Sequence, residues 1–141
     1  VINPLGRYRY AKSLLAAAHP PVWCAKIIGL HDGYWPGEAD MAEGNPMLML
    51  ERGEDVQTPP AMWIQASNDE VHNYLDPDSP FKGTELERFA FNYRKAGGKF
   101  QAEIIDAPPM FTTAHPTLPA SIAAVDRLVE FVRSNIPDPR G

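Results

Sequence analysis

The stretch PPAMWIQASNDE, residues 59–70, and the stretch FQAEIIDAP, residues 100–108, decide the predicted fold. The first places the apolar run 61–66 between two prolines and a polar turn, which is typical of a buried parallel strand. In the second, apolar and polar residues alternate, as they do in a half-exposed edge strand. We therefore predict two strands, each of which runs into a loop.

A helix is predicted between these strands. Thr84 and Glu87 form a capping box, an apolar face follows, and Gly97 and Gly98 end the helix. Because strand, helix and strand make a βαβ unit, the strands should be parallel and joined by a right-handed crossover. A last amphipathic helix, predicted over 119–136 from apolar residues at helical spacing, would cover the sheet. Two parallel strands need neighbours, so we expect further strands from other polypeptide.

The first part of the chain reads differently. Asn3 and Pro4 are a good helix start, and apolar residues at helical spacing predict a helix over 4–18. From Pro20 to Pro60 the periodicity is poor, and prolines and glycines interrupt the apolar patches. This pattern predicts a loop-rich insertion with one or two short helices.

Composition excludes several classes of protein. The net charge is −5 and the basic residues are scattered, which argues against a nucleic-acid partner. No apolar run approaches the roughly 18 to 20 residues that a membrane span needs, so we expect no membrane insertion and favour a cytoplasmic location. The single cysteine, Cys24, excludes an internal disulfide framework and is read as a small packed side chain.

Each predicted strand leads to a residue that can do acid–base chemistry. Asp69 follows the first strand, and His115 lies in the loop after the second. In parallel α/β sheets the site lies at the carboxyl ends of the strands, so both residues should open on one edge. An acid that precedes a histidine matches the last two members of the chain order Ser, Asp, His in α/β-hydrolases.

Several segments together resemble one family, the hormone-sensitive-lipase-like carboxylesterases of the α/β-hydrolase group. The resemblance to its last segments rests on PPAMWIQASNDEVHNY, ERFAFNYRKAGG, FQAEIIDAP and AHPTLPASIAAVDRLVEFV, and the resemblance to its cap insertion rests on NPLGRYRYAKSLL and NPMLMLERGE. It implies an α/β fold, namely the C-terminal part of an α/β-hydrolase sheet with two parallel strands, flanking helices and a cap insertion, incomplete on its own. Residues 1–58 would be the cap segment and 59–141 the core segment.

The resemblance also implies roles for particular residues. Asp69 would be the triad acid that orients His115, and His115 would be the general base for a serine and the acid for the leaving group. Glu70 is adjacent, so the acid assignment could move by one position. Val71, in the same loop, is a candidate substrate contact. The expected substrate is a small-molecule ester, with no cofactor and no metal.

The nucleophile and the oxyanion hole are expected outside this chain. The 141 residues contain neither G-x-S-x-G nor an HGGG-like segment. Acyl transfer without them has no nucleophile and no preorganised donors, so the chain by itself should be catalytically silent. We expect the N-terminal half of the hydrolase to supply both, either in the same polypeptide or as a separate chain.

Other readings of these residues stay open at this point. Asp69 could be a turn residue, and His115 could cap the last helix or be an ordinary loop histidine. A metal site built from Asp69, His72 and His115 is conceivable but has no second carboxylate at ligand spacing. Alternative functions are a non-catalytic binding subunit on a hydrolase scaffold and a prolyl-oligopeptidase-type peptidase.

Overall fold

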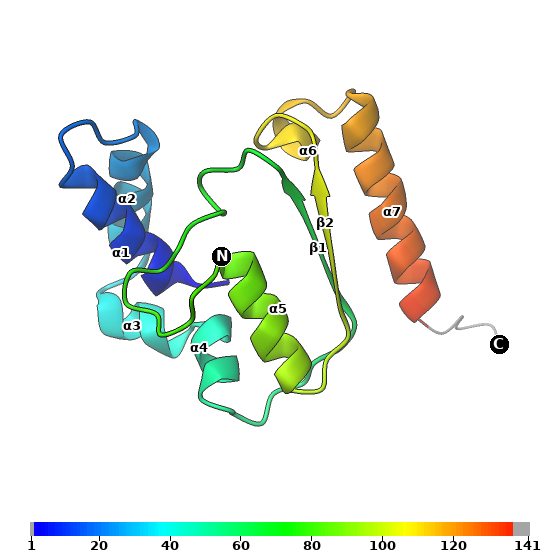
Figure 1. The fold of residues 1–141 in the computed structure, drawn as a ribbon, viewed down its shortest axis with the longest axis horizontal. Helices are drawn as coiled ribbons and strands as arrows, with labels where there is room; N and C mark the ends of the chain where they lie inside the picture. Colours follow the sequence, from blue (N-terminus) through cyan, green and yellow to red (C-terminus); the bar gives the residue numbers. More distant parts are fainter. Residues whose placement is uncertain (1, 137–141) are drawn as a thin grey trace. The chain divides into compact units, whose positions relative to one another are not determined.

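The structure, a computed structural model, describes residues 2–136 and is a mixed α/β arrangement of two compact units (Figure 1). The first, which we call the helical unit, comprises residues 1–57 and 70–96. The second, the sheet unit, comprises residues 58–69 and 97–141. One boundary between the units lies near residue 58, and residues 70–96 group with the first part of the chain. The assignment to a hydrolase cap and core stays a prediction.

Two parallel strands form the sheet unit's only sheet in the described part of the chain. Strand β1 spans Ala61–Ala66 and strand β2 spans Phe100–Ile105. Their register pairs Ala61 with Phe100 and Ala66 with Ile105. Both predicted strands and their parallel pairing are confirmed. The handedness of the crossover stays a prediction, because the intervening helix belongs to the helical unit.

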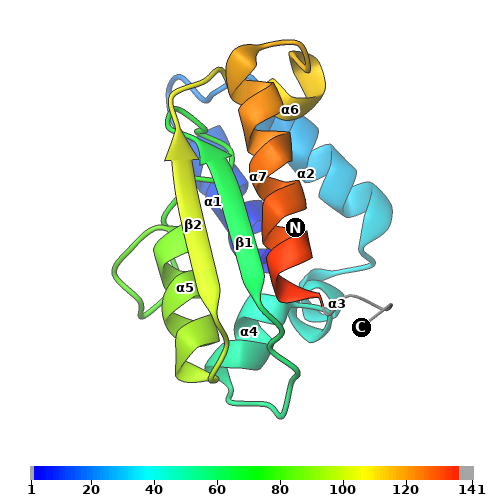
Figure 2. The same ribbon diagram turned by 90° about the vertical axis from the view of Figure 1, so that its right-hand side faces the viewer.

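Two helices complete the sheet unit. The short helix α6 spans Phe111–Ala114, and α7 spans Pro119–Asn135, as predicted with a proline in its first turn. Figure 2 shows α7 running along β1 rather than β2. The core between helices and sheet is small; its buried members are Ala66, Ala107, Phe111 and Ala124, and Ile64, Ile105 and Ala120 pack against them.

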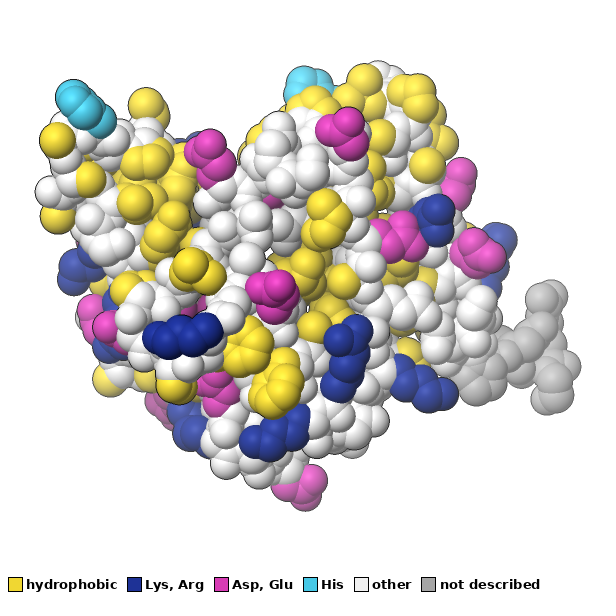
Figure 3. Space-filling view, viewed as in Figure 1, with side chains coloured by type: hydrophobic (Ala, Val, Ile, Leu, Met, Phe, Trp, Pro, Cys, Tyr) yellow, Lys and Arg dark blue, Asp and Glu magenta, His cyan; other side chains and the backbone are white. Residues whose placement is uncertain are grey.

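The apolar stripe that predicted α7 is exposed. Its large side chains are between 39% and 61% exposed, and they are Ile122, Val125, Leu128, Val129, Val132 and Ile136. Figure 3 shows hydrophobic side chains gathered at the upper right, over the first turns of α7. The helix packs instead through the neighbouring side that carries Ser121 and Ala124. The amphipathic pattern was therefore sufficient to identify a helix but did not identify the side that is buried in this chain.

The helical unit contains five helices in its described residues, the first four of which lie in residues 4–51. They are α1 (Pro4–Leu15), α2 (Trp23–Tyr34), α3 (Glu38–Glu43), α4 (Pro46–Glu51) and α5 (Glu85–Lys95). The predicted capping box of α5 is confirmed, since Thr84 and Glu87 satisfy each other's backbone N–H groups. Asn3 caps α1 by accepting from the N–H of Gly6, although α1 ends at Leu15 rather than at residue 18.

The prediction of a loop-rich insertion underestimated the helical content of residues 20–60. Three helices, not one or two, lie between Pro20 and Pro60, and α2 alone has 12 residues. One helix start was readable, because Asn45 followed by Pro46 repeats the Asn-Pro pattern seen at the start of α1. The Asn45 side chain accepts from the N–H groups of Met47 and Leu48. Helix α2 begins at Trp23, and its N-cap residue, Val22, makes no side-chain cap, so its start left no such signal.

A buried charge network fastens the second segment of the helical unit to the first. The guanidinium of Arg88 donates to both carboxylate oxygens of Glu51 at 2.7 Å. It also donates to Asp76 at 2.7 Å and to Glu85 at 3.1 Å. Since Glu51 lies in the first segment and the others in 70–96, this network explains why the two segments form one unit. Burial is the main influence that raises the pKa of Glu85, while Arg88 opposes it.

Candidate active site at the carboxyl edge of the sheet

The carboxyl ends of β1 and β2 meet at one edge of the sheet, and the two predicted site residues follow from them. The backbone N–H of Ser67 donates to the carbonyl of Ile105 at 2.9 Å, which extends the strand pairing into the first turn residue. The N–H of Asp69 then donates to the carbonyl of Ala66 at 3.3 Å and closes a tight turn. Asp69 is half-buried and lies directly after β1.

The route from β2 to His115 is a short, sharply folded segment. Met110 has a φ of 58°, a left-handed conformation that costs free energy for a residue with a side chain. The single-turn helix α6 follows, and the N–H of His115 donates to the carbonyl of Phe111 at 3.0 Å. Figures 1 and 2 show α6 beside the tips of the two strand arrows. The segment thus keeps His115 close to the carboxyl edge of the sheet.

Ser121, in the first turns of α7, holds the backbone of this segment. Its buried hydroxyl lies 2.9 Å from the carbonyl oxygen of Phe111 and 2.7 Å from that of His115. Since a hydroxyl has one proton, the two carbonyls share one donor. Sequence analysis assigned no role to Ser121. The signal for a structural role was its position in the sequence: Ser121 lies two residues after Pro119, in the first turn of the helix that follows the loop.

The imidazole of His115 is exposed. Asp69 has an interaction of its own. The structure groups the acid and the histidine in one unit, after the ends of two adjacent strands. A working triad also needs a direct hydrogen bond between them. That contact stays a prediction for the complete protein.

The remaining predicted site residues belong to the helical unit. Val71 is half-buried and His72 is exposed, and both lie in the segment that begins at Glu70. The structure does not bring them into one unit with His115. No group of three or more His, Cys, Asp or Glu side chains in the described residues has an arrangement suited to a metal ion. None of the helices in that part of the chain is long and apolar enough to cross a membrane.

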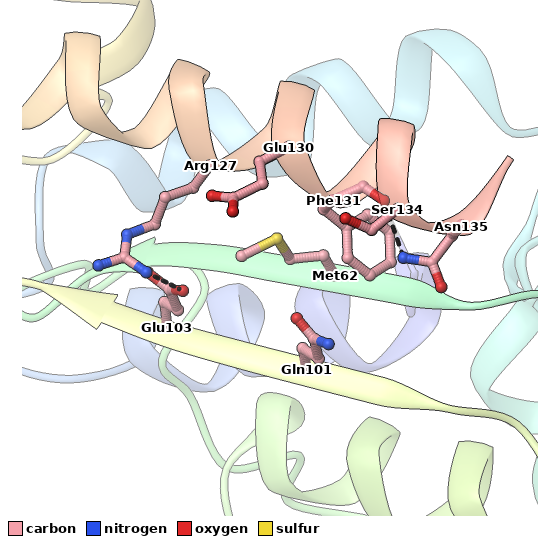
Figure 4. Close-up of a pocket in the computed structure, with 8 residues that line it drawn as sticks. All are labelled: Met62, Gln101, Glu103, Arg127, Glu130, Phe131, Ser134 and Asn135. Atoms are coloured by element: carbon pink, nitrogen blue, oxygen red, sulfur yellow. Dashed lines mark hydrogen bonds and ion pairs between the residues drawn. The ribbon is translucent and has the colours of Figure 1, made fainter. Parts of the chain in front are cut away.

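A groove also lies between α7 and the strands, away from the carboxyl edge (Figure 4). Met62 and Gln101, the second residues of β1 and β2, lie on its floor, and Arg127 pairs with Glu103 at 3.0 Å in its wall. Its volume is about 200 Å³, below the range of about 300–1,000 Å³ that is usual for small-molecule sites. Two carboxylates, Glu103 and Glu130, line the groove, and the first of them is already paired with Arg127.

Comparison with protein-family models, with curated proteins and with solved structures found no match. The resemblance to α/β-hydrolases therefore stays a prediction that rests on the residues quoted above.

Proposed function

We propose that this chain is the C-terminal portion of a serine carboxylic ester hydrolase, in which Asp69 and His115 are the acid and the base of the catalytic triad. The observation that carries the proposal is the placement of both residues. They follow the carboxyl ends of two adjacent parallel strands, with the acid first in the chain. This is the edge at which α/β sheets carry their sites and the order that α/β-hydrolases use.

In the proposed reaction, His115 takes the proton of a serine hydroxyl as that oxygen attacks the ester carbonyl, and later gives the proton to the leaving alcohol. Asp69 would accept a hydrogen bond from the other ring nitrogen, fix the tautomer and stabilise the imidazolium. The exposure of His115 supports this role, because an exposed ring is open to a serine carried by other polypeptide. The Ser121 hydroxyl holds the backbone carbonyls of Phe111 and His115, which restricts the positions open to the His115 ring.

The orientation of α7 supports a sheet that continues beyond β1. Residues of an α-helix follow one another at about 100°. The buried face of α7 carries Ala124, and Arg127 therefore lies to one side of that face. Because Arg127 pairs with Glu103, a residue of β2, this side of the helix is turned towards β2. The exposed stripe, which includes Val125 and Val129, lies to the other side, towards the open edge of β1. Exposed apolar surface beside an unpaired strand edge is what a further strand and its helix would cover.

That further polypeptide is the proposed partner, the N-terminal half of the hydrolase. It would supply the nucleophilic serine and the oxyanion donors, which the 141 residues lack as motifs. Ser67 does lie at the carboxyl edge, but Gln65 and Asp69 stand where a nucleophile elbow, G-x-S-x-G, has its two glycines. The substrate would be a small-molecule ester.

The test is ester turnover by the native protein that contains this chain. His115→Ala should lower kcat on a short p-nitrophenyl ester by about 10⁴-fold, since the triad acts as a unit. His19→Ala is the matched control, because His19 is an exposed histidine in the helical unit, and it should leave kcat unchanged. Turnover that survives in His115→Ala would contradict the proposal, and a native protein without ester turnover would favour a non-catalytic binding subunit.

A further inference from the structure

A second candidate site lies in the helical unit, where the chain passes from α2 to α3. It is an open pocket of about 490 Å³, which we call the α2–α3 pocket. Its lining residues are Tyr34, Trp35, Pro36, Asp40, Glu43 and Gly44. The volume lies in the range that is usual for small-molecule sites, and the lining combines aromatic surface with two carboxylates.

Two aromatic rings form a corner of this pocket. The rings of Tyr34 and Trp35 meet edge to face, with 4.9 Å between their centroids and an angle of 78° between their planes. The Trp35 ring also lies close to the backbone of Gly44, where any larger residue would bring its Cβ within 3.3 Å of the ring. Tyr34 is 76% exposed. The pair therefore presents preformed aromatic surface to solvent.

The two carboxylates of the pocket lack the partners that neighbouring carboxylates have. Residues 32–51 contain five carboxylates and neither lysine nor arginine. Three of the five have partners from other elements: Asp32 accepts from the Tyr8 hydroxyl, Glu38 pairs with Arg9, and Glu51 pairs with Arg88. The side chains of Asp40 and Glu43 make no ion pair or hydrogen bond within the described residues. The pocket thus carries negative charge beside aromatic rings, with no cation of its own.

A weakly hydrated organic cation suits this combination. Aromatic faces attract cations, and quaternary ammonium groups are the ligands that aromatic sites most often recognise. Nearby carboxylates add to the attraction. A divalent metal ion fits less well, because Ca²⁺ takes about six to eight oxygen ligands and Mg²⁺ requires an octahedral shell of oxygens. Aromatic rings supply none of these oxygens.

We propose that the α2–α3 pocket binds a small soluble cation with an alkylated ammonium group, such as trimethylammonium. The rings of Tyr34 and Trp35 would contact the methyl groups, and Asp40 and Glu43 would balance the charge. A phosphocholine head group fits less well, because the same two carboxylates would repel its phosphate. The proposal concerns only residues of the helical unit, so it stands or falls independently of the ester hydrolase.

The test is titration of the full chain with choline, followed by NMR of ¹⁵N-labelled tryptophan indoles. The chain has three tryptophans, and Trp23 and Trp63 serve as internal references. We expect a saturable shift of the Trp35 signal and at least about fivefold weaker binding of neohexanol, the neutral counterpart in which carbon replaces the charged nitrogen. No saturable shift at Trp35, or equal binding of neohexanol, would overturn the proposal. Phosphocholine that binds as tightly as choline would contradict the choice of a soluble cation over a lipid head group.

Two variants with matched controls locate the site. Tyr34→Ala removes one wall and should weaken choline binding by about fivefold, whereas Phe91→Ala, which removes an exposed ring of α5, should not. Glu43→Gln removes one charge and should weaken binding by about threefold, while Asp55→Asn, at another exposed carboxylate of the helical unit, should have no effect. Because Tyr34 and Glu43 are exposed, both variants should fold. Unchanged choline binding in Tyr34→Ala and Glu43→Gln would contradict the proposal.

Discussion

The two units of this chain differ in what holds them together and in what they leave exposed. In the helical unit, Arg88 is buried and every described carboxylate around it is within 3.1 Å of the guanidinium. In the sheet unit, the core consists of a few small side chains, and the apolar stripe of α7 remains exposed. The difference teaches that the charge network of the helical unit has its partners within the described residues, while the sheet unit leaves its largest apolar surface exposed.

The largest expected effect on stability concerns the network of the helical unit. Arg88→Ala leaves Glu51, Asp76 and Glu85 close together without their cation, and should lower the free energy of unfolding by about 3–5 kcal/mol. Thermal or urea unfolding measures the loss. Lys95→Ala, at an exposed position of the same helix, is the control and should change stability by less than about 0.5 kcal/mol. A similar small change in both variants would show that the network does not hold the unit together.

Ser121→Ala tests the buried hydrogen bonds that hold the segment before α7 in the sheet unit. The change removes the one donor shared by the carbonyls of Phe111 and His115, and should cost about 1–3 kcal/mol. Ser134→Ala, in the exposed last turn of α7, should be close to neutral. In the native protein we also expect Ser121→Ala to lower ester turnover, because the backbone of His115 would lose its anchor. Equal stability of the two variants would contradict this account.

Val129→Asp sharpens the contrast between the units, because it tests whether other polypeptide covers the exposed apolar stripe of α7 in the native protein. Val129 is 41% exposed within this chain, so a charge there should change the stability of the 141 residues by no more than about 0.5 kcal/mol. In the native protein it should lower Tm clearly, because a charge would be buried. Ala123→Asp, on the polar side of the helix, is the control. Equal Tm values for the two native variants would mean that nothing covers the stripe.

The smallest expected effect is a change in pH dependence. The pKa of Glu85 is raised, chiefly by burial, so the folded state holds its proton more tightly than the unfolded state does. Stability should therefore fall as pH rises from the ordinary carboxyl pKa through the raised one, and the penalty should persist above it. Glu85→Gln, which is neutral throughout, should lack this fall in urea unfolding between pH 4 and 8. An unchanged pH profile would show that another group is responsible.

The elements that the sequence predicted well are those with local signals. The strand at 61–66 is bounded by prolines and a polar turn, and α5 is bounded by a capping box and a pair of glycines. Helix α2 lacks a side-chain cap and was missed. The buried face of α7 was also missed, because periodicity reports where apolar residues lie on a helix but not which of them find partners.

The candidate site was predictable only in part, for a similar reason. Asp69 and His115 could be placed at one edge, because the carboxyl ends of parallel strands meet there. Whether they touch depends on loop conformation and on neighbours, neither of which leaves a periodic signal. The anchoring of His115 through Ser121 is a contact between two consecutive elements, and only the structure reveals it.

The central claim is that Asp69 and His115 serve a serine carried outside these 141 residues. The most direct test is to label the native protein with a fluorophosphonate, which reacts with activated serines, and to sequence the labelled peptide. We predict one labelled serine in a G-x-S-x-G segment that is not among these residues, and loss of the label in His115→Ala but not in His19→Ala. A native protein that takes no label, or a label that persists in His115→Ala, would contradict the account.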